Sequence, residues 1–121
     1  MKFIKDPVNS LTVRRIEPGR LGIGESMYES TVAITADCVL DDLTVPDVAE
    51  LQDRDLEPLL KTDPEMIVVG TGWSQVRPPR DLVFSMARRG IGLEVMDTPA
   101  ACRTFNILVA EGRRPAALLV I

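Results

Sequence analysis

The chain has 121 residues, of which 45% are hydrophobic and 26% are charged, and its formal net charge is -4. This length fits one domain, spanning residues 1–121, whose core is large enough to fold without disulfides or metals. The acidic balance argues against binding to DNA or RNA, because phosphate binding needs a surplus of Lys and Arg on one face.

The sequence contains no histidine. Ser-His-Asp catalysis, Cys-His catalysis and His-ligated zinc sites are therefore excluded within one chain. The two cysteines, Cys38 and Cys102, make neither a disulfide framework nor a zinc motif. We therefore expect free thiols in a reducing compartment, and the pattern predicts no catalytic residue, metal or cofactor.

The amino-terminal residues carry no pattern of a secretory or transit peptide, and no apolar run is long enough to span a membrane. We therefore expect a cytoplasmic protein without a membrane span. Residues 1–10 are polar and contain Pro7, so we expect this segment to be flexible.

The first third of the chain is expected to form antiparallel β structure. Apolar and polar residues alternate over 11–16 and again over 21–24, and Pro18-Gly19 between them is typical of a hairpin turn. Residues 27–40 carry β-branched and apolar residues with a period of two, which favours further strands.

A short helix and a buried strand are expected next. Residues 53–60 predict a helix that Asp53 or Asp55 caps, with Pro58 in or near its first turn. The continuous apolar run over 66–69 is typical of a strand that is buried on both faces of a parallel sheet.

Two helices and two strands are expected in the remaining chain. An amphipathic helix over 80–89 ends at Gly90, and a short strand follows at 93–96. Thr98 is expected to cap the next helix, with Pro99 in its first position. Gly112 follows the last turn of that helix, and residues 115–121 form a final buried strand.

These expectations together predict an α/β fold with a three-layer mixed sheet. An antiparallel β N-terminal part is followed by a βαβαβ half, whose strands right-handed crossovers would make parallel. Ligands of open α/β sheets bind at the carboxyl edge of the strands. We therefore predict one rim where the ends of strands 66–69 and 93–96 meet.

Seven residues make up the candidate ligand site at this rim. Free amides at the start of a helix can hold an anion, an arginine can pair with it, and an exposed tryptophan can stack on a ligand or partner. Proton transfer would fall to Glu94 or Asp97. The candidate residues are Gly70, Thr71, Gly72, Trp73, Asp97, Thr98 and Arg103.

Structural roles for the same residues are the alternative. The Gly70-x-Gly72 pair lacks a dinucleotide fingerprint, since Gln75 stands where a third glycine belongs. Cys102 shares a helix face with core residues, which favours a buried thiol. Carboxylates such as Glu94 and Asp97 more often cap helices and form ion pairs than do chemistry. In the same structural alternative Thr98 is a helix cap, and Arg103 and Asn106 strap loops.

The segments MIVVGTG at 66–72 and GIGLEVMDTPAACRTFNILVAEGRRPAALLV at 90–120 resemble a family of small domains of unknown function. That family includes the mitochondrial respiratory complex I assembly factor three and an adipogenesis-associated domain protein. The matching residues are Gly70, Thr71, Gly72, Glu94, Met96, Asp97, Thr98, Ala101, Cys102, Arg103, Thr104, Asn106, Glu111, Gly112 and Arg113.

The resemblance implies a three-layer α/β fold with a mixed sheet and an N-terminal β portion, and it supplies no established reaction. Pro115 departs from the apolar residue that is usual before the last strand. Mitochondrial members act as assembly partners in building an inner-membrane enzyme and carry a presequence, which is not visible here. A bacterial cytoplasmic relative is therefore the expected setting.

Two functions from different classes follow. The first is a non-enzymatic interaction or assembly-factor-like module with a protein partner, linked by resemblance to complex I assembly. The alternative is an enzyme that binds a small molecule or anion in a pocket at the carboxyl edge of strands 66–69 and 93–96. The sequence leaves open whether the chain forms a homo-oligomer.

Overall fold

The computed structural model describes residues 11–121, so the predicted flexible segment 1–10 lies outside the described residues. The chain begins with a small antiparallel sheet, sheet A, made of strands β1, β2 and β3 in that order. Gly19 occupies the turn between β1 and β2 with φ +83°, a conformation that glycine adopts at little cost. The predicted hairpin is therefore present. The strand bounds are Val13–Glu17, Arg20–Ile23 and Ser26–Tyr28.

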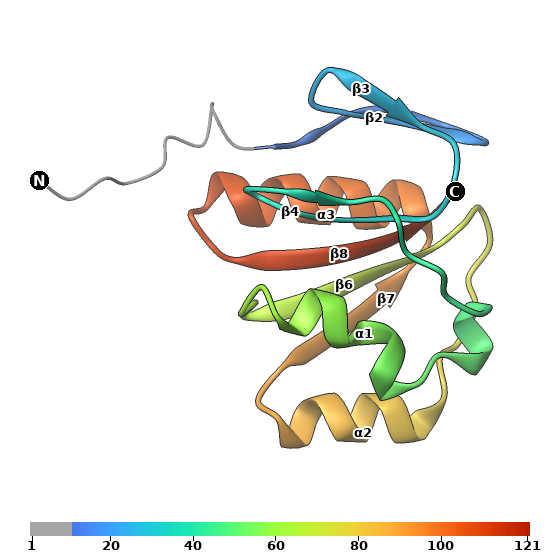
Figure 1. The fold of residues 1–121 in the computed structure, drawn as a ribbon, viewed down its shortest axis with the longest axis vertical. Coiled ribbons are helices and arrows are strands. Elements are labelled where there is room, and N and C mark those ends of the chain that lie inside the picture. Colours follow the sequence, from blue (N-terminus) through green and yellow to red (C-terminus); the bar gives the residue numbers. More distant parts are fainter. Residues whose placement is uncertain (1–10) are drawn as a thin grey trace, which may run out of the picture.

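A second, mixed sheet, sheet B, forms the centre of the molecule (Figure 1), with its five strands in the order β5-β4-β8-β6-β7. β6 is parallel to both β7 and β8, whereas β4 is antiparallel to β8 and to β5. Helix α2 connects β6 to β7, and α3 connects β7 to β8. The bounds are β4 Val32–Thr35, β5 Val39–Leu40, η2 Val48–Glu50, α1 Asp53–Leu60, β6 Met66–Thr71, α2 Arg80–Arg88, β7 Gly92–Met96, α3 Thr98–Ala110 and β8 Pro115–Val120.

Each face of sheet B is covered by helices, because the residues of its central strands are apolar on both faces. Val68 and Leu119 pack with Phe105 of α3 in one buried cluster, which also takes in the inner face of sheet A. Ile67 and Leu118 point the other way and pack with α1 and α2. The predicted three-layer α/β fold is therefore confirmed, with sheet A stacked on the α3 side (Figure 1).

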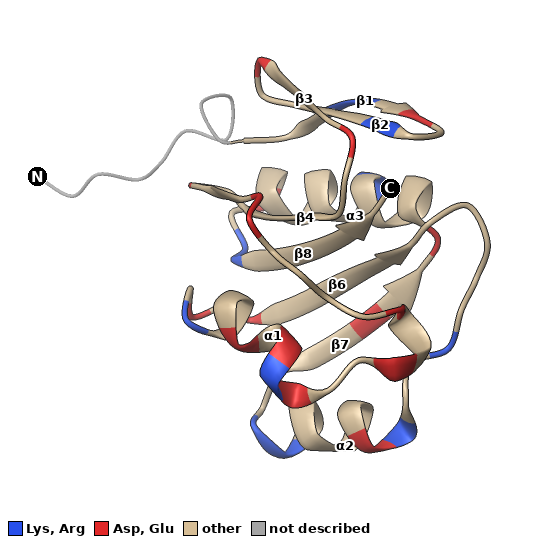
Figure 2. Cartoon of the chain, turned by 45° about the vertical axis from the view of Figure 1, so that its right-hand side comes forward, with Lys and Arg blue, Asp and Glu red and all other residues tan. Residues whose placement is uncertain are grey.

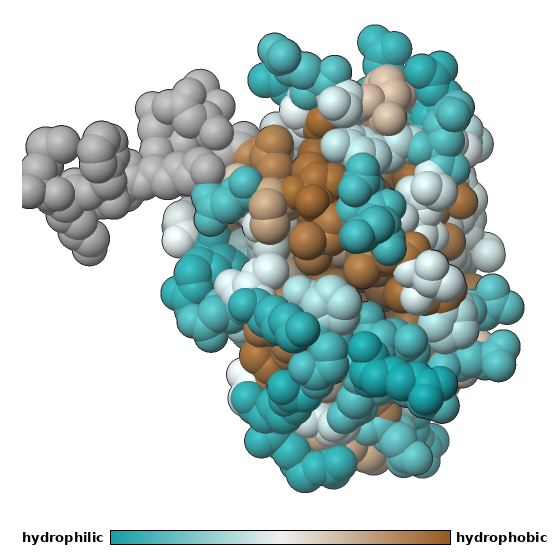
Figure 3. Space-filling model, viewed as in Figure 1, coloured by the Kyte–Doolittle hydropathy of each residue, from teal (hydrophilic) through white to brown (hydrophobic). Residues whose placement is uncertain are grey.

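Charged residues of both signs alternate along the outer faces of α1 and α2, whereas β4, β6 and β8 carry almost none (Figure 2). On the face shown in Figure 3, apolar side chains gather between sheet A and sheet B. Partly buried residues that pack on the first cluster there include Ile16, Tyr28 and Val39.

The N-terminal ends of α1 and α3 differ from the prediction. Gln52, and neither Asp53 nor Asp55, caps α1: its side chain accepts from the backbone of Asp55, whose carboxylate accepts from the Gln52 amide at 2.8 Å. Pro58 consequently lies inside the helix rather than in its first turn.

In α3 the cap is Asp97, whose carboxylate accepts from the amide of Ala100 at 2.9 Å, so Thr98 takes the first helical position. Gly112, which was expected after the last turn of this helix, lies there and has a φ of +78°. The single β region expected over 27–40 divides into parts of β3, β4 and β5, which belong to two sheets.

Candidate functional site

The carboxyl ends of β6 and β7 lie side by side. The two strands pair in parallel, with Gly70 opposite Met96. Immediately beyond them the amide of Thr98 donates to the carbonyl of Gly72 at 2.7 Å. The chain thus brings 70–72 and 97–98 together at one edge of sheet B, as expected for parallel neighbours.

Thr98 is the residue that joins this edge together. Its side chain is completely buried. Its hydroxyl accepts from the amide of Gly72 at 2.8 Å and donates to the carbonyl of Val120 at 2.6 Å. One hydroxyl therefore connects α3 to the ends of β6 and β8, and its only proton is committed to a backbone carbonyl.

Gly70 allows Thr98 to sit this close to the sheet. A Cβ added at Gly70 would lie 2.8 Å from Thr98 Oγ1, 3.0 Å from Thr98 Cα and 3.1 Å from Ala101 Cβ. Real Cβ atoms do not approach a backbone atom and a hydroxyl so closely, so a side chain here would push α3 off the sheet. The first glycine of the Gly-Thr-Gly segment thus serves helix packing.

The other candidate residues have different surroundings. The Thr71 hydroxyl donates to the carbonyl of Ser74 at 2.6 Å, and Asp97 caps α3. Arg103 is exposed on α3, and Trp73 is 42% exposed in the loop that follows β6. The backbone of residues 70–72 and 97–98 thus comes together, whereas Arg103 lies more than one helical turn beyond the capping residue Asp97.

Of the seven candidates, only Thr71 lines one of the described cavities. That cavity has a volume of about 350 Å³ and lies between η2 and the ends of β6 and β8. Its walls include Pro46, Val48, Val76 and Val120. Asp47 is the sole charged residue in its lining, so the cavity offers no cationic side chain for an anion.

A larger groove runs between β7 and α3. Its volume is about 450 Å³. Met66, Gly92, Glu94 and Met96 form its floor on the strands, and Thr104 and Leu108 form its wall on α3. Nothing in the apolar pattern of α3 alone predicts this groove. The signal available in the sequence is the presence of Gly92 and Glu94 in an otherwise apolar strand.

The thiol of Cys102, near the start of α3, is unreactive because it is buried. Burial raises the pKa of Cys102 to about 12, against which the nearby Arg103 guanidinium acts only partly. The other cysteine, Cys38, is half-buried and lies 3.3 Å from the Thr35 hydroxyl. Within residues 11–121 no group of three or more acidic or cysteine residues could hold a metal ion.

The matched run also joins sheet A to the rest of the molecule. The amide group of Asn106 pairs with the backbone of Val13 in β1, accepting from its N–H and donating to its carbonyl, both at 2.9 Å. Because the Asn106 side chain makes the hydrogen bonds that a neighbouring strand would otherwise make, it fixes β1 against α3. Both hydrogen bonds of the Asn106 side chain thus support the fold.

A family model described as a protein of unknown function, DUF498/DUF598, matches residues 13–120. The chain belongs to this family. The resemblance drawn from residues 66–72 and 90–120 is thereby confirmed, and the match extends it over sheet A and the strands before α1.

Relatives in this family span bacteria and animals. The chain is 32% identical over 101 residues to the 13 kDa major membrane protein of Francisella tularensis, covering 83% of this chain and 80% of that protein. It is 47% identical over 62 residues to the human NADH dehydrogenase (ubiquinone) 1 alpha subcomplex assembly factor 3. That match covers 51% of this chain but only 34% of the human protein, so the chain corresponds to about a third of that relative.

The fold is shared with solved structures of the family. The NMR structure of a Xanthomonas campestris protein superposes with a TM-score of 0.84 at 30% identity, covering 97% of this chain and 89% of that one. In the part of the chain that is described here, no helix is both long enough and apolar enough to cross a membrane.

Proposed function

We propose that this chain is a protein-interaction module without a reaction of its own, which assists the assembly of a larger complex. The observation that carries the proposal is the use of the family's polar run. Thr98, Asp97 and Asn106 direct their hydrogen bonds to the backbone of the same chain. These three residues of the matching run thus support the fold, so a function in partner binding would rest on other residues at the surface.

The relatives suggest what kind of complex is assembled. The human relative is named as an assembly factor for NADH dehydrogenase, and the match to it covers 51% of this chain. We infer that this chain assists assembly of a respiratory complex I or of a related membrane enzyme.

A deletion strain tests this function directly. NADH-dependent quinone reduction should fall in its membranes, while succinate-dependent quinone reduction should stay at the level of the parent strain. Complementation with the full chain should restore the NADH-dependent rate. Equal rates in the deletion and parent strains would refute the link to complex I.

The proposed compartment is the cytoplasm, where free thiols such as Cys38 and the buried Cys102 persist. The name of the Francisella relative points instead to the membrane fraction. Fractionation of source cells should find the chain in the soluble fraction, or on membranes in a form that high salt releases. Retention on membranes after a high-salt wash would contradict the cytoplasmic proposal.

The enzyme hypothesis has less support from this geometry. The Thr98 hydroxyl has its proton committed, and an exposed Arg103 faces no described cavity. The ligand site at Gly70–Trp73 and Asp97–Arg103 stays a prediction, which a titration with inorganic phosphate can test. Saturating NMR shifts confined to the amides of 98–100 would favour the anion-binding alternative over the interaction module.

A further inference from the structure

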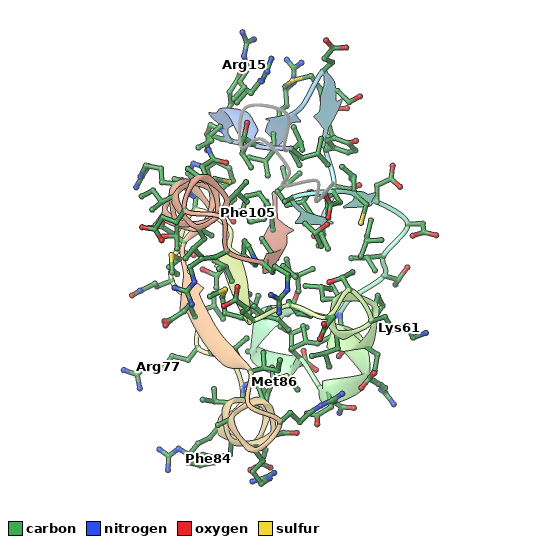
Figure 4. The ribbon with its side chains drawn as sticks, turned by 90° about the vertical axis from the view of Figure 1, so that its left-hand side faces the viewer. Arg15, Lys61, Arg77, Phe84, Met86 and Phe105 are labelled. Carbon is green, nitrogen blue, oxygen red and sulfur yellow. The ribbon has the colours of Figure 1, made fainter. Side chains whose placement is uncertain are left out.

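Strand β7 forms one edge of sheet B, and its outer side is unpaired among the described residues. Sheet B ends with β7, which pairs only with β6 over residues 11–121. Gly92 and Glu94 are exposed, whereas the other three residues of the strand are partly buried. In Figure 4, β7 runs along the flank of the molecule between α3 and α2, opposite Lys61, which follows the last residue of α1.

An unpaired edge of five residues offers a row of backbone N–H and C=O groups to another strand. Natural sheets commonly shield such an edge with a helix, a loop or a strongly twisted end. Here the α3 side is open instead, because the groove of about 450 Å³ lies directly beside the strand. A strand added at this edge would therefore find both hydrogen-bonding groups and room for its side chains.

The chemistry of the groove specifies the incoming residue. Met66, Met96 and Leu108 offer apolar surface, and the exposed Glu94 projects from the middle of the strand. Glu94 has no hydrogen bond or ion pair with any described residue, whereas Arg113 at the end of the groove already pairs with Glu65 at 3.7 Å. Lys or Arg fits this site, since an aliphatic stem can pack on the methionines while the cationic head reaches Glu94.

The opposite face of β7 accepts apolar residues. Leu93 and Val95 are partly buried on the α2 side and pack with the second core cluster. Phe84 of α2 is 54% exposed and projects on the same flank as β7 in Figure 4. An incoming strand with alternating basic and apolar residues would therefore match both faces of the edge.

A second copy of this chain fits the edge less well. Two β7 strands paired antiparallel about their centres would place Glu94 opposite Glu94, and like charges directly opposite one another are destabilising. A charged side chain on an edge strand deters pairing with a strand that does not neutralise the charge. The charge thus favours a different, basic partner over self-association.

We propose that the outer edge of β7 binds an extended segment of a partner protein as a further strand of sheet B, with a Lys or Arg of that segment in the groove beside Glu94. This inference rests on the proposed interaction function and names its surface and the chemistry of the partner. Main-chain hydrogen bonds supply general affinity in this mode of binding, and the groove supplies selectivity.

Synthetic peptides test the proposal on the full-length protein labelled with ¹⁵N. The probe is acetyl-Thr-Val-Lys-Val-Lys-Val-Thr-amide, and its counterpart has Glu in place of both Lys. The Lys peptide should shift the amides of 92–96 and of Thr104 and Leu108, and the Glu peptide should bind at least about tenfold more weakly. No shift at millimolar Lys peptide, or shifts centred elsewhere, would overturn the proposal.

Exchange of charge provides the decisive control. Glu94→Lys should lower the affinity for the Lys peptide and raise the affinity for the Glu peptide, each by about tenfold. Glu94→Gln should abolish the preference for the Lys peptide over the Glu peptide. Glu25→Lys makes the same change of charge in the exposed turn before β3 and should leave both affinities unchanged. Equal effects of the substitutions at 94 and 25 would show long-range attraction only and would overturn the proposal.

Two further outcomes separate this surface from the proposed function. Concentration-dependent shifts of 92–96 without peptide would identify a second copy as the occupant and would overturn the proposal. If deletion of the chain impairs complex I assembly and Glu94→Lys complements fully while the peptides fail to bind, the surface is wrong and the function stands. If the peptides bind as expected but the deletion has no effect, the proposed function fails and the edge remains a binding site.

Discussion

Replacing Gly70 with alanine tests how α3 is seated on sheet B. The new Cβ would meet Thr98 Oγ1 at 2.8 Å and Thr98 Cα at 3.0 Å. Because one of these atoms belongs to the backbone, relief requires a shift of the start of α3. Overpacking of this kind costs about 1–3 kcal/mol. The shift also stretches the two buried hydrogen bonds of the Thr98 hydroxyl, each of which costs roughly 1 kcal/mol or more when lost.

We therefore expect Gly70→Ala to lower the free energy of unfolding by about 3 kcal/mol. Urea unfolding followed by circular dichroism measures this value. Gly92→Ala is the matched control, since it also adds one methyl to a glycine in sheet B, but its Cβ would lie 3.8 Å from Met66 Cβ, an ordinary contact. The control should change stability by less than about 1 kcal/mol. Equal effects of the two substitutions would refute the close approach of α3 at Gly70.

The remaining predictions concern the hydroxyl, the amide and the thiol of α3. Thr98→Val keeps the shape of the side chain but leaves the Gly72 amide and the Val120 carbonyl without their partner, so urea unfolding should show a loss of about 2–4 kcal/mol; wild-type stability would contradict this. Asn106→Ala should release β1 from α3, so hydrogen exchange of the amides in sheet A should accelerate at least about tenfold while β6 stays protected. Native protein should expose one thiol to a chromogenic disulfide, that of Cys38, and denatured protein two. Since the pKa of Cys102 is raised from 9.0 to about 12 in the folded state, stability is retained below pH 9 and falls above it, by roughly 1 kcal/mol between pH 8 and pH 10. Cys102→Ala should remove the part of this loss of stability at high pH that comes from the Cys102 thiol.

The order and type of most elements followed from sequence because their signals are local. The apolar run at 66–69 and the turn at Pro18-Gly19 specify a buried strand and a hairpin without reference to distant residues. The position of β4 beside β8 could not be predicted in this way. Nothing local distinguishes a strand that joins sheet B from one that joins sheet A.

The cap of α3 shows why tertiary contacts decide between similar residues. Asp97 and Thr98 are both good capping residues, so the sequence permits either one. The structure assigns the cap to Asp97 because the Thr98 hydroxyl is bound by Gly72 and Val120, which lie 26 and 22 residues away in the chain. The same contacts give Gly70 and Gly72 a role in seating α3 on sheet B, whereas their place in a ligand site stays a prediction.

The groove beside β7 was missed for a related reason. Whether α3 covers one strand or three depends on the crossing of the helix over the sheet, which the periodicity of α3 alone does not define. Leu108 and Thr104 face the groove, whereas Phe105 faces the core, although Phe105 directly follows Thr104 in the sequence. Exposure at Gly92 and Glu94 became meaningful only once the position of α3 was known.

Native size-exclusion chromatography of gently lysed source cells shows whether the chain works by binding another protein. We expect the chain to elute well above its 13.3 kDa mass, together with a defined set of other proteins, and Glu94→Lys to shift it towards the free form. Elution of the wild-type chain entirely at 13.3 kDa, under conditions that keep other assemblies intact, would refute a function in protein binding.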